Sequence, residues 1–182
     1  DECAARTLAF DDADQLVGWG AEFDVPLSGS ITVDVSAHET EVVSVEEDGA
    51  DAARIALEEC VWDGGVAIFP ADTLYGLACD PLSEAAVERI HRIKGRAEGK
   101  SSAVMYFAPL AMRELLAGLG PRTLEAVGAL LPGPVTLVVA NRERRYPLAS
   151  REDPGRLGVR LIEGPLAGMP LPVFQTSANP SG

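Results

Sequence analysis

Apolar and polar residues alternate along the chain in two ways, and the pattern changes near residue 50. From residue 51 onward, helical spacing predicts helices at residues 51–60, 84–94, 110–118 and 121–131. Short apolar runs predict buried strands at residues 66–69, 103–107, 135–140, 159–162 and 172–175. The alternation of the two element types indicates an α/β or α+β domain.

The first fifty residues have a different pattern. Residues 31–35 and 41–45 alternate in polarity as two strands joined by a turn, whereas residues 1–10 are consistent with a helix. The sequence therefore predicts one helix and one pair of strands ahead of the alternating region.

The helix at residues 84–94 has clear signals at its start and along one face. Ser83 is suited to the N-cap position, because its hydroxyl can accept a hydrogen bond from the first turn. Val87, Ile90 and Ile93 recur at three-residue spacing and predict the buried face of this helix.

Two cations follow the same helix. Lys94 lies at its C-terminal end and Arg96 two positions further on, so both can turn toward one point if the backbone there is extended. A guanidinium fork and an ammonium group suit a triphosphate. The same charges could instead complement the helix dipole, an effect of about 0.3–1 kcal/mol. The residues alone leave both interpretations open.

Composition limits the classes of partner. The chain of 182 residues can bury the core of one domain, and its net charge of −13 disfavours tight non-specific binding of nucleic acid. No apolar stretch approaches the ~20 residues of a membrane span, and no signal peptide is recognisable. Three widely spaced cysteines make a disulfide framework improbable, so we expect a cytoplasmic protein without membrane association.

Several kinds of catalytic machinery are absent from the sequence. Two histidines and no Cys-x-x-Cys pair leave no zinc cluster, and no Gly-x-Ser-x-Gly elbow indicates a serine hydrolase. The segment GRAEGKS (95–101) has three residues between its glycines where a P-loop has four, and it follows a helix instead of a strand. Lys100 of this segment stays a candidate phosphate contact.

Polar residues near strand ends form a second group of candidates. Thr73 follows the strand at residues 66–69, where loops commonly bind ligands, although turn chemistry explains it equally well. Ser177 and Asn179 offer a hydroxyl and an amide beside small residues, in a stretch that could also be an ordinary turn. Thr136 and Arg160 lie within apolar strands, and a buried arginine needs an anionic partner such as a substrate carboxylate.

In this order, five segments of the chain resemble the YrdC/Sua5 family, the threonylcarbamoyl-AMP synthases. The matching segments are PADTLYGL (70–77), KGRAEGKS (94–101), LPGPVTLVV (131–139), GVRL (158–161) and TSANPSG (176–182). The chain departs from the family at Ala71, which replaces a threonine, and at Ala97 and Ser101, which replace prolines.

This resemblance implies a fold and a reaction. The fold would be an open, twisted, mixed β-sheet with flanking helices, and the enzyme would be a nucleotidyltransferase. It would form threonylcarbamoyl-AMP and pyrophosphate from L-threonine, bicarbonate and ATP, with Mg²⁺, for the t6A modification of tRNA. A downstream threonylcarbamoyl transferase complex would use the product, and direct binding of tRNA is not expected.

The resemblance also implies roles for individual residues. Lys94 and Arg96 would hold the ATP phosphates and act as the catalytic cations. Beside the nucleotide it places Lys100, Thr136 and Asn179, and around L-threonine it places Thr73, Arg160 and Ser177, with Ser30 added if the chain is permuted.

The N-terminal segment suggests a circular permutation. Residues 26–35 (PLSGSITVDV) resemble the strand that the family has after its TSAN segment, and residues 14–17 resemble the preceding one. Residues 1–40 would then be the family's C-terminal portion placed first, and residues 41–182 its N-terminal and central portion, in one domain. The alternative is an unrelated N-terminal extension combined with a C-terminal truncation. Close termini would be required by the permutation.

Other functions fit the same residues. A carbamoyl-adenylate-forming domain of hydrogenase maturation shares the fold, but normally belongs to a longer chain. An RNA-binding module or an inactive paralogue is a further alternative, and the net charge of −13 argues against RNA binding.

Overall fold

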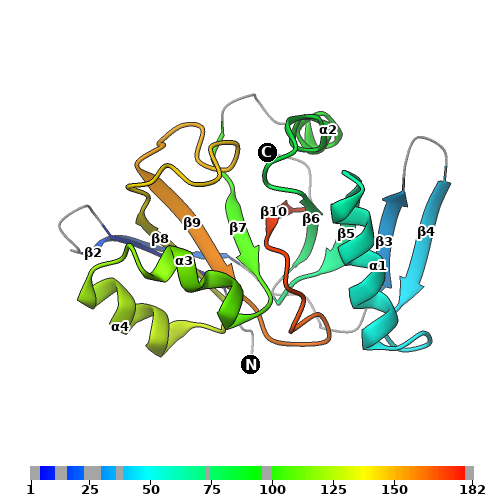
Figure 1. The fold of residues 1–182 in the computed structure, drawn as a ribbon, viewed down its shortest axis with the longest axis horizontal. Coiled ribbons are helices and arrows are strands. Elements are labelled where there is room, and N and C mark those ends of the chain that lie inside the picture. The colour runs from blue at the N-terminus through cyan, green and yellow to red at the C-terminus, as the bar shows by residue number, and fades with distance from the viewer. Residues whose placement is uncertain are drawn as a thin grey trace.

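The structure is a computed structural model that describes residues 5–10, 16–22, 30–35, 39–72, 74–95 and 100–178, with side chains from residue 41 onward. Ten strands in these ranges form one twisted sheet in the order β2-β1-β8-β9-β7-β10-β6-β5-β3-β4, with β2 and β4 at its two edges (Figure 1). The strands are Ala5–Phe10 (β1), Leu16–Glu22 (β2), Ser30–Val35 (β3), Glu39–Ser44 (β4), Val66–Pro70 (β5), Tyr75–Cys79 (β6), Ala103–Tyr106 (β7), Val135–Ala140 (β8), Arg156–Leu161 (β9) and Val173–Ser177 (β10).

The sheet is mixed. The β1–β8 and β7–β9 pairs are parallel, and the other neighbouring pairs are antiparallel. Four α-helices and one 3-10 helix of the described ranges flank it: Ala50–Trp62 (α1), Glu84–Lys94 (α2), Pro109–Met112 (η1), Arg113–Leu116 (α3) and Pro121–Leu130 (α4). This is the open, mixed sheet with flanking helices that the family resemblance implies, and it confirms the α/β or α+β class that the residue pattern predicts.

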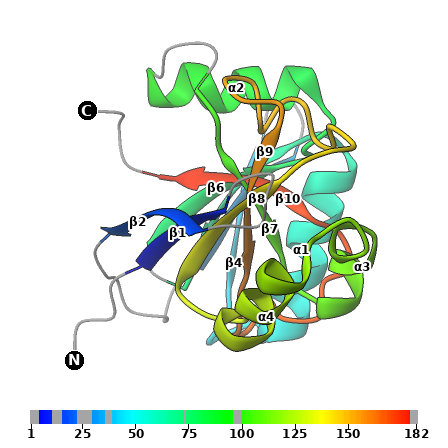
Figure 2. The ribbon, with the colours of Figure 1, turned by 90° about the vertical axis from the view of Figure 1, so that its left-hand side faces the viewer.

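Side chains of the central strands alternate between two hydrophobic clusters. Val104 and Tyr106 of β7 belong to one cluster, which also takes side chains from α2, α3 and α4. Met105 and Phe107 belong to the other, which contains the buried face of α1. Figure 2 shows α1, α2 and the α3–α4 pair at separate places around the sheet. The alternation follows from the two-residue period of a strand and buries the sheet on both faces.

Helix α2 begins as its sequence predicts but buries a different face. The Ser83 hydroxyl accepts a hydrogen bond from the backbone N–H of Ala86, as an N-cap residue does. Val87 and Ile90 are buried, whereas Ile93 is 58% exposed. Lys94 takes its place on the buried face, one turn after Ile90, because the helix meets the polar end of β10 there.

Seven strand predictions are confirmed with ends that differ by no more than three residues: 31–35, 41–45, 66–69, 103–107, 135–140, 159–162 and 172–175. The predicted helix at residues 1–10 is wrong, since residues 5–10 form strand β1, which pairs with β2 and β8. Its local pattern did not reveal pairing with residues more than a hundred positions away. At 110–118 the expected helix is instead a 3-10 turn followed by four helical residues.

The N-terminal strands lie at both edges of the sheet. Strands β1 and β2 continue it beyond β8, while β3 and β4 continue it beyond β5 (Figure 1). Residues of both sequence halves therefore share one sheet. The ends of the chain, on which the permutation test depends, lie outside the described residues, so the permutation stays a prediction.

Candidate functional site

Three described segments end close together: the turn between β5 and β6, strand β10 and helix α2. The turn is closed by a hydrogen bond from the Ala71 N–H to the Leu74 carbonyl oxygen at 3.1 Å. At the end of β10, the N–H of Ala178 donates to the Tyr75 carbonyl oxygen at 2.7 Å. These bonds place the described parts of the PADTLYGL and TSAN segments side by side.

Lys94 joins the helix to the end of β10. Its side chain is buried, and its Nζ donates to the Ser177 carbonyl oxygen and lies 3.3 Å from the Ser177 Oγ. Gly95 ends the helix directly afterwards with a φ of 59°, a left-handed conformation that glycine adopts without steric cost. The helix thus stops where its last side chain reaches Ser177.

Arg160 extends from β9 on the face that carries Met105. The two residues are partners in the parallel β7–β9 register, and Val159, next to Arg160, points into the opposite cluster. The guanidinium group forms an ion pair with the Asp72 carboxylate, and its Nη1 lies 3.5 Å from Thr136 Oγ1 on β8. The predicted need of this buried arginine for an anion is confirmed, and the anion is a side chain of the protein itself.

Asp72 is the member of the site that the sequence interpretation missed. Its side chain is 12% exposed, and only Oδ1 contacts Arg160. The second carboxylate oxygen, Oδ2, is buried and has no hydrogen-bond partner among the described residues. Burial raises the pKa of the Asp72 carboxyl above 3.8, while the charge and hydrogen bond of Arg160 oppose the rise.

Gly76 allows the strands to meet closely beside the site. A Cβ atom at this position would lie 3.0 Å from the Phe69 ring and 3.1 Å from the amide nitrogen of Gln175. Gly76 is also the register partner of Ser177. A larger residue would therefore push apart the strands that carry the turn and Ser177.

The structure brings together two pairs of predicted site residues, Lys94 with Ser177 and Arg160 with Thr136. Lys100 is exposed to solvent. Ser30 begins β3, of which the backbone is described. The remaining predicted residues, Thr73, Arg96 and Asn179, lie outside the described residues.

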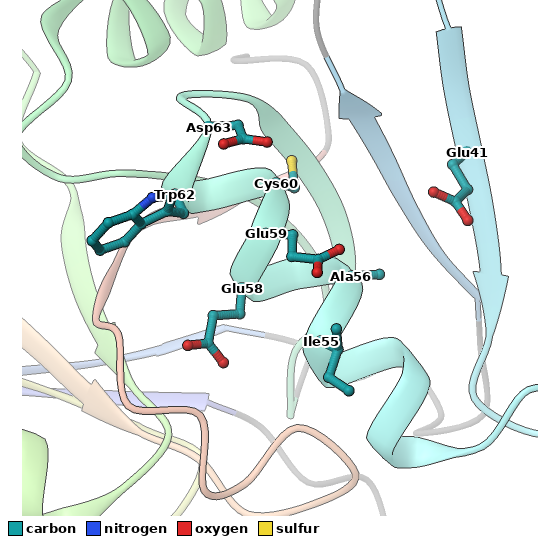
Figure 3. Close-up of a pocket in the computed structure, with 8 residues that line it drawn as sticks. All are labelled: Glu41, Ile55, Ala56, Glu58, Glu59, Cys60, Trp62 and Asp63. Atoms are coloured by element: carbon teal, nitrogen blue, oxygen red, sulfur yellow. The ribbon is translucent and has the colours of Figure 1, made fainter.

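A different hollow lies on the outer side of α1, facing β4 (Figure 3). It has a volume of about 520 Å³ and is lined mainly by α1, with the exposed Trp62 and the carboxylates of Glu58 and Glu59, and by Asp63 directly after the helix. It contains none of the predicted site residues.

Within the described ranges, no helix combines the length and apolar character that crossing a bilayer requires.

Fold and site together define an α/β protein with a polar, partly charged site at one end of a mixed sheet. The sequence model of the Sua5/YciO/YrdC family, described as "Telomere recombination", matches residues 59–182. The chain belongs to this family, as its motifs indicate.

Named relatives are enzymes of one kind. The threonylcarbamoyl-AMP synthase of Methylobacillus flagellatus is 34% identical over 134 residues, which cover 70% of this chain and 73% of that protein. The threonylcarbamoyl-AMP synthase of Mus musculus is 40% identical over 104 residues, 57% of this chain and 36% of that protein. Among solved structures, the fold is similar to that of P. abyssi Sua5, whose crystal structure is complexed with L-threonine. The TM-score is 0.60 and the sequence identity 30%, and the match covers 71% of this chain and 39% of the Sua5 chain. The chain thus spans about a third to three quarters of these proteins.

Proposed function

We propose that this protein is an L-threonylcarbamoyladenylate synthase. The observation that carries the proposal is the contact between Lys94 and Ser177, which are 83 residues apart in sequence. It joins the KGR and TSAN segments, the two segments in which a nucleotide site is expected, at one point of the fold. Relatives named threonylcarbamoyl-AMP synthase, and a Sua5 structure complexed with L-threonine, support the same activity.

The reaction would form and break bonds in two steps. The amine of L-threonine forms a C–N bond with carbon dioxide derived from bicarbonate, giving N-carboxythreonine. A carboxylate oxygen of this compound then forms a bond to the α-phosphorus of ATP, and the bond to pyrophosphate breaks. Negative charge grows on the departing pyrophosphate, so cations held in place beforehand lower the barrier without covalent catalysis.

The chain's cations would perform this charge neutralisation. Lys94, already fixed against Ser177, and Arg96 would hold the triphosphate, with Lys100, Thr136 and Asn179 near the nucleotide. L-threonine would lie near Thr73, Ser177 and Arg160. Magnesium would be held chiefly by the phosphates of ATP, as Mg²⁺ is in many nucleotide enzymes.

The product would serve tRNA modification. Threonylcarbamoyl-AMP is an activated carbamate and needs a transferase to deliver it to adenosine in tRNA. We infer that a separate transferase complex accepts the product, and that the reaction takes place in the cytoplasm.

Pyrophosphate release tests the activity directly. The purified chain is incubated with ATP, Mg²⁺ and bicarbonate, and with L-threonine, L-serine or no amino acid. We expect release that depends on L-threonine and falls about 10²- to 10³-fold in Arg96→Ala. Arg113→Ala removes an exposed arginine from α3 and serves as the matched control with unchanged release. ATP binding without threonine-dependent release would instead indicate a carbamoyl-transfer relative or an inactive paralogue.

We further propose that residues 1–40 are the family's C-terminal portion in permuted order. The support is the pairing of β3 with β5 and of β1 with β8, through which this segment enters the same sheet as residues 41–178. Ser30, at the start of β3, would then contribute a hydroxyl to the threonine site. A rearranged chain with residues 41–182 placed before residues 1–40 should fold and release pyrophosphate at a similar rate. An unfolded rearranged chain would contradict the permutation.

A further inference from the structure

Strand β4 forms one edge of the sheet, and its two faces offer different surroundings to a neighbouring strand. Among the described strands it pairs with β3 alone, so its outer side can accept the backbone hydrogen bonds of a further strand. We propose that β4 is a docking edge for an extended segment of a partner protein in which basic and apolar residues alternate.

The side chains of β4 alternate between the two faces of the sheet. Val43 is buried in the cluster that contains the inner side of α1, so Glu41, two residues earlier, lies on the same face. Val42 lies on the opposite face and is 61% exposed. A strand added beside β4 alternates in the same way. Its successive side chains therefore meet carboxylates on one face and an apolar residue on the other.

The face that carries α1 is acidic next to this edge. Four carboxylates and no basic residue line the hollow between α1 and β4: Glu41, Glu58, Glu59 and Asp63. In Figure 3, Glu59 extends from α1 on the side of β4, whereas Trp62 lies on the other flank of the helix. Across the residues that the structure describes, none of the four carboxylates forms an ion pair. Arginine side chains of an added strand would supply the opposite charge.

The opposite face has an apolar row that reaches the same edge. Val42 is the register partner of Thr32 in β3, and Thr32 is the register partner of Ile68 in β5. Register partners lie on the same face of a sheet, and Ile68 is 37% exposed. An apolar side chain of an added strand would pack beside Val42 and continue this row.

Charge selects the kind of occupant. If the β4 strands of two copies of this chain paired, Glu41 and the other carboxylates of the hollow would lie near the same groups of the second copy. Like charges opposite one another destabilise a strand pair. The net charge of −13 likewise disfavours a nucleic acid. A basic segment is attracted by the same charges, which favours it over both of these occupants.

The docking edge is separate from the candidate site, so the proposal goes beyond the proposed function. The Lys94–Ser177 contact lies at the end of β10, and strands β6, β5 and β3 lie between β10 and β4. Four strand spacings of about 4.8 Å place roughly 20 Å between the two strands. A partner on β4 therefore leaves the site open, and we expect pyrophosphate release to be unaffected by changes at the edge.

Fluorescence anisotropy with two labelled peptides tests the inference on the wild-type chain. One peptide alternates arginine and valine, and the other has the same composition in blocks of two, which keeps the charge but mixes both residue types on each face. We expect the chain to bind the alternating peptide about tenfold more tightly, because only this order directs every arginine to the carboxylates. Equal affinity would overturn the proposal, since net charge alone would then explain the binding.

A pair of charge-matched variants locates the basic contacts. Glu41→Gln/Glu59→Gln should weaken binding of the alternating peptide about three- to tenfold, as expected for two exposed ion pairs. Glu46→Gln/Glu47→Gln makes the same change of charge at exposed positions in the turn before α1, and should alter the affinity less than about twofold. An equal effect of the two double variants would overturn the docking edge.

A second matched pair tests the apolar contact. Val42→Lys places a like charge on the edge and should weaken binding of the alternating peptide about tenfold. Leu110→Lys introduces the same charge at an exposed position of η1 and should leave the affinity within about twofold of wild type. An unchanged affinity in Val42→Lys would contradict docking at β4.

Two further measurements separate this inference from its alternatives. If sedimentation velocity of the chain alone showed a dimer that Val42→Lys disperses, β4 would be assigned to a second copy and the basic partner would be overturned. Threonine-dependent pyrophosphate release should be equal in Val42→Lys and wild type. The peptide comparison needs neither catalysis nor a variant, so it decides the docking edge even if the wild type releases no pyrophosphate or a variant fails to fold.

Discussion

Two buried cations of the site have different kinds of partner. Lys94 donates to the carbonyl oxygen of Ser177 and lies near its hydroxyl, both of which are neutral. Arg160 donates to the Asp72 carboxylate, which is charged. Both cations are about 95% buried, so the difference lies in their partners and not in their exposure to water.

This difference in partners predicts how costly the loss of each cation is. A neutral oxygen that loses a cation loses one hydrogen bond, whereas a buried carboxylate that loses its cation keeps a charge that it must then neutralise. Lys94 therefore connects two segments at moderate cost. Arg160 and Asp72 depend on each other, and substitution of either one should have a large effect.

The largest effect is expected for Arg160→Met. The variant should lower the free energy of unfolding by about 3–5 kcal/mol, because it leaves the Asp72 carboxylate buried without its cation. Urea denaturation at pH 7 measures this loss. In the double variant with Asp72→Asn, the loss should be smaller than the sum of the two single losses. Additive losses would mean that the pair is not coupled.

The same variant should respond to pH with a definite sign. Burial raises the pKa of Asp72 above 3.8, and Arg160 lowers it, so removal of Arg160 leaves the folded-state pKa still higher. The folded state then binds a proton more tightly than the unfolded state. Its stability therefore falls as the pH rises from the unfolded-state pKa of Asp72 through the higher folded-state pKa. Relative to wild type, Arg160→Met should therefore lose least near pH 4 and most near neutral pH. An equal loss at every pH would contradict this account.

A smaller effect is expected for Lys94→Met. The substitution keeps most of the apolar chain but leaves the Ser177 carbonyl without this donor, at a cost of about 1–3 kcal/mol. Thermal unfolding monitored by circular dichroism measures it. If Lys94 also binds the triphosphate, ATP binding by calorimetry should weaken in parallel, whereas Arg160→Met should weaken L-threonine binding first.

Ser177→Ala tests the hydroxyl separately from the carbonyl. The variant removes the Oγ that lies 3.3 Å from Lys94 Nζ and keeps the carbonyl contact, so we expect a loss of about 0.5–1.5 kcal/mol. Thermal unfolding beside Lys94→Met makes the comparison direct. A loss as large as that of Lys94→Met would show that the hydroxyl, and not the carbonyl, carries the contact.

Thr136→Val should have the smallest effect. Its hydroxyl lies 3.5 Å from Arg160 Nη1, at the outer limit of a hydrogen bond, and valine has nearly the same shape. The free energy of unfolding should change by less than about 0.5–1 kcal/mol, the lower range of one hydrogen bond. A larger loss in urea denaturation would mean that Thr136 positions Arg160 more firmly than the distance indicates.

The sequence predicted elements whose signals are local. The apolar runs of β5, β8 and β10 and the N-cap at Ser83 each follow from neighbouring residues, and the structure has them. Strand β6, with the sequence YGLAC, was not among the predicted strands. Strand β1 was assigned as a helix, although it pairs with the nearby β2 as well as with β8, which lies more than a hundred residues further along the chain.

The site was predictable as a set of residue types but not as a set of contacts. Arg160 in an apolar strand indicates that an anion must lie nearby. The identity of that anion depends on which turn ends near β9, which only the fold decides. Asp72 could have been found by asking which carboxylate of the matching segments lies beside a strand end. Asp72 was instead interpreted as a capping residue of the turn, so its pairing with Arg160 was not predicted.

The long sequence separation of the site contacts has a consequence for the order of folding. Lys94 and Ser177 are 83 residues apart, and Asp72 and Arg160 are 88 apart. Contacts of this kind require closure of long loops and gain little until the intervening strands are paired. We expect both to form after the rate-limiting step. Their loss should then speed unfolding more than it slows folding, so the site, last to assemble, would be the first part of the molecule to open.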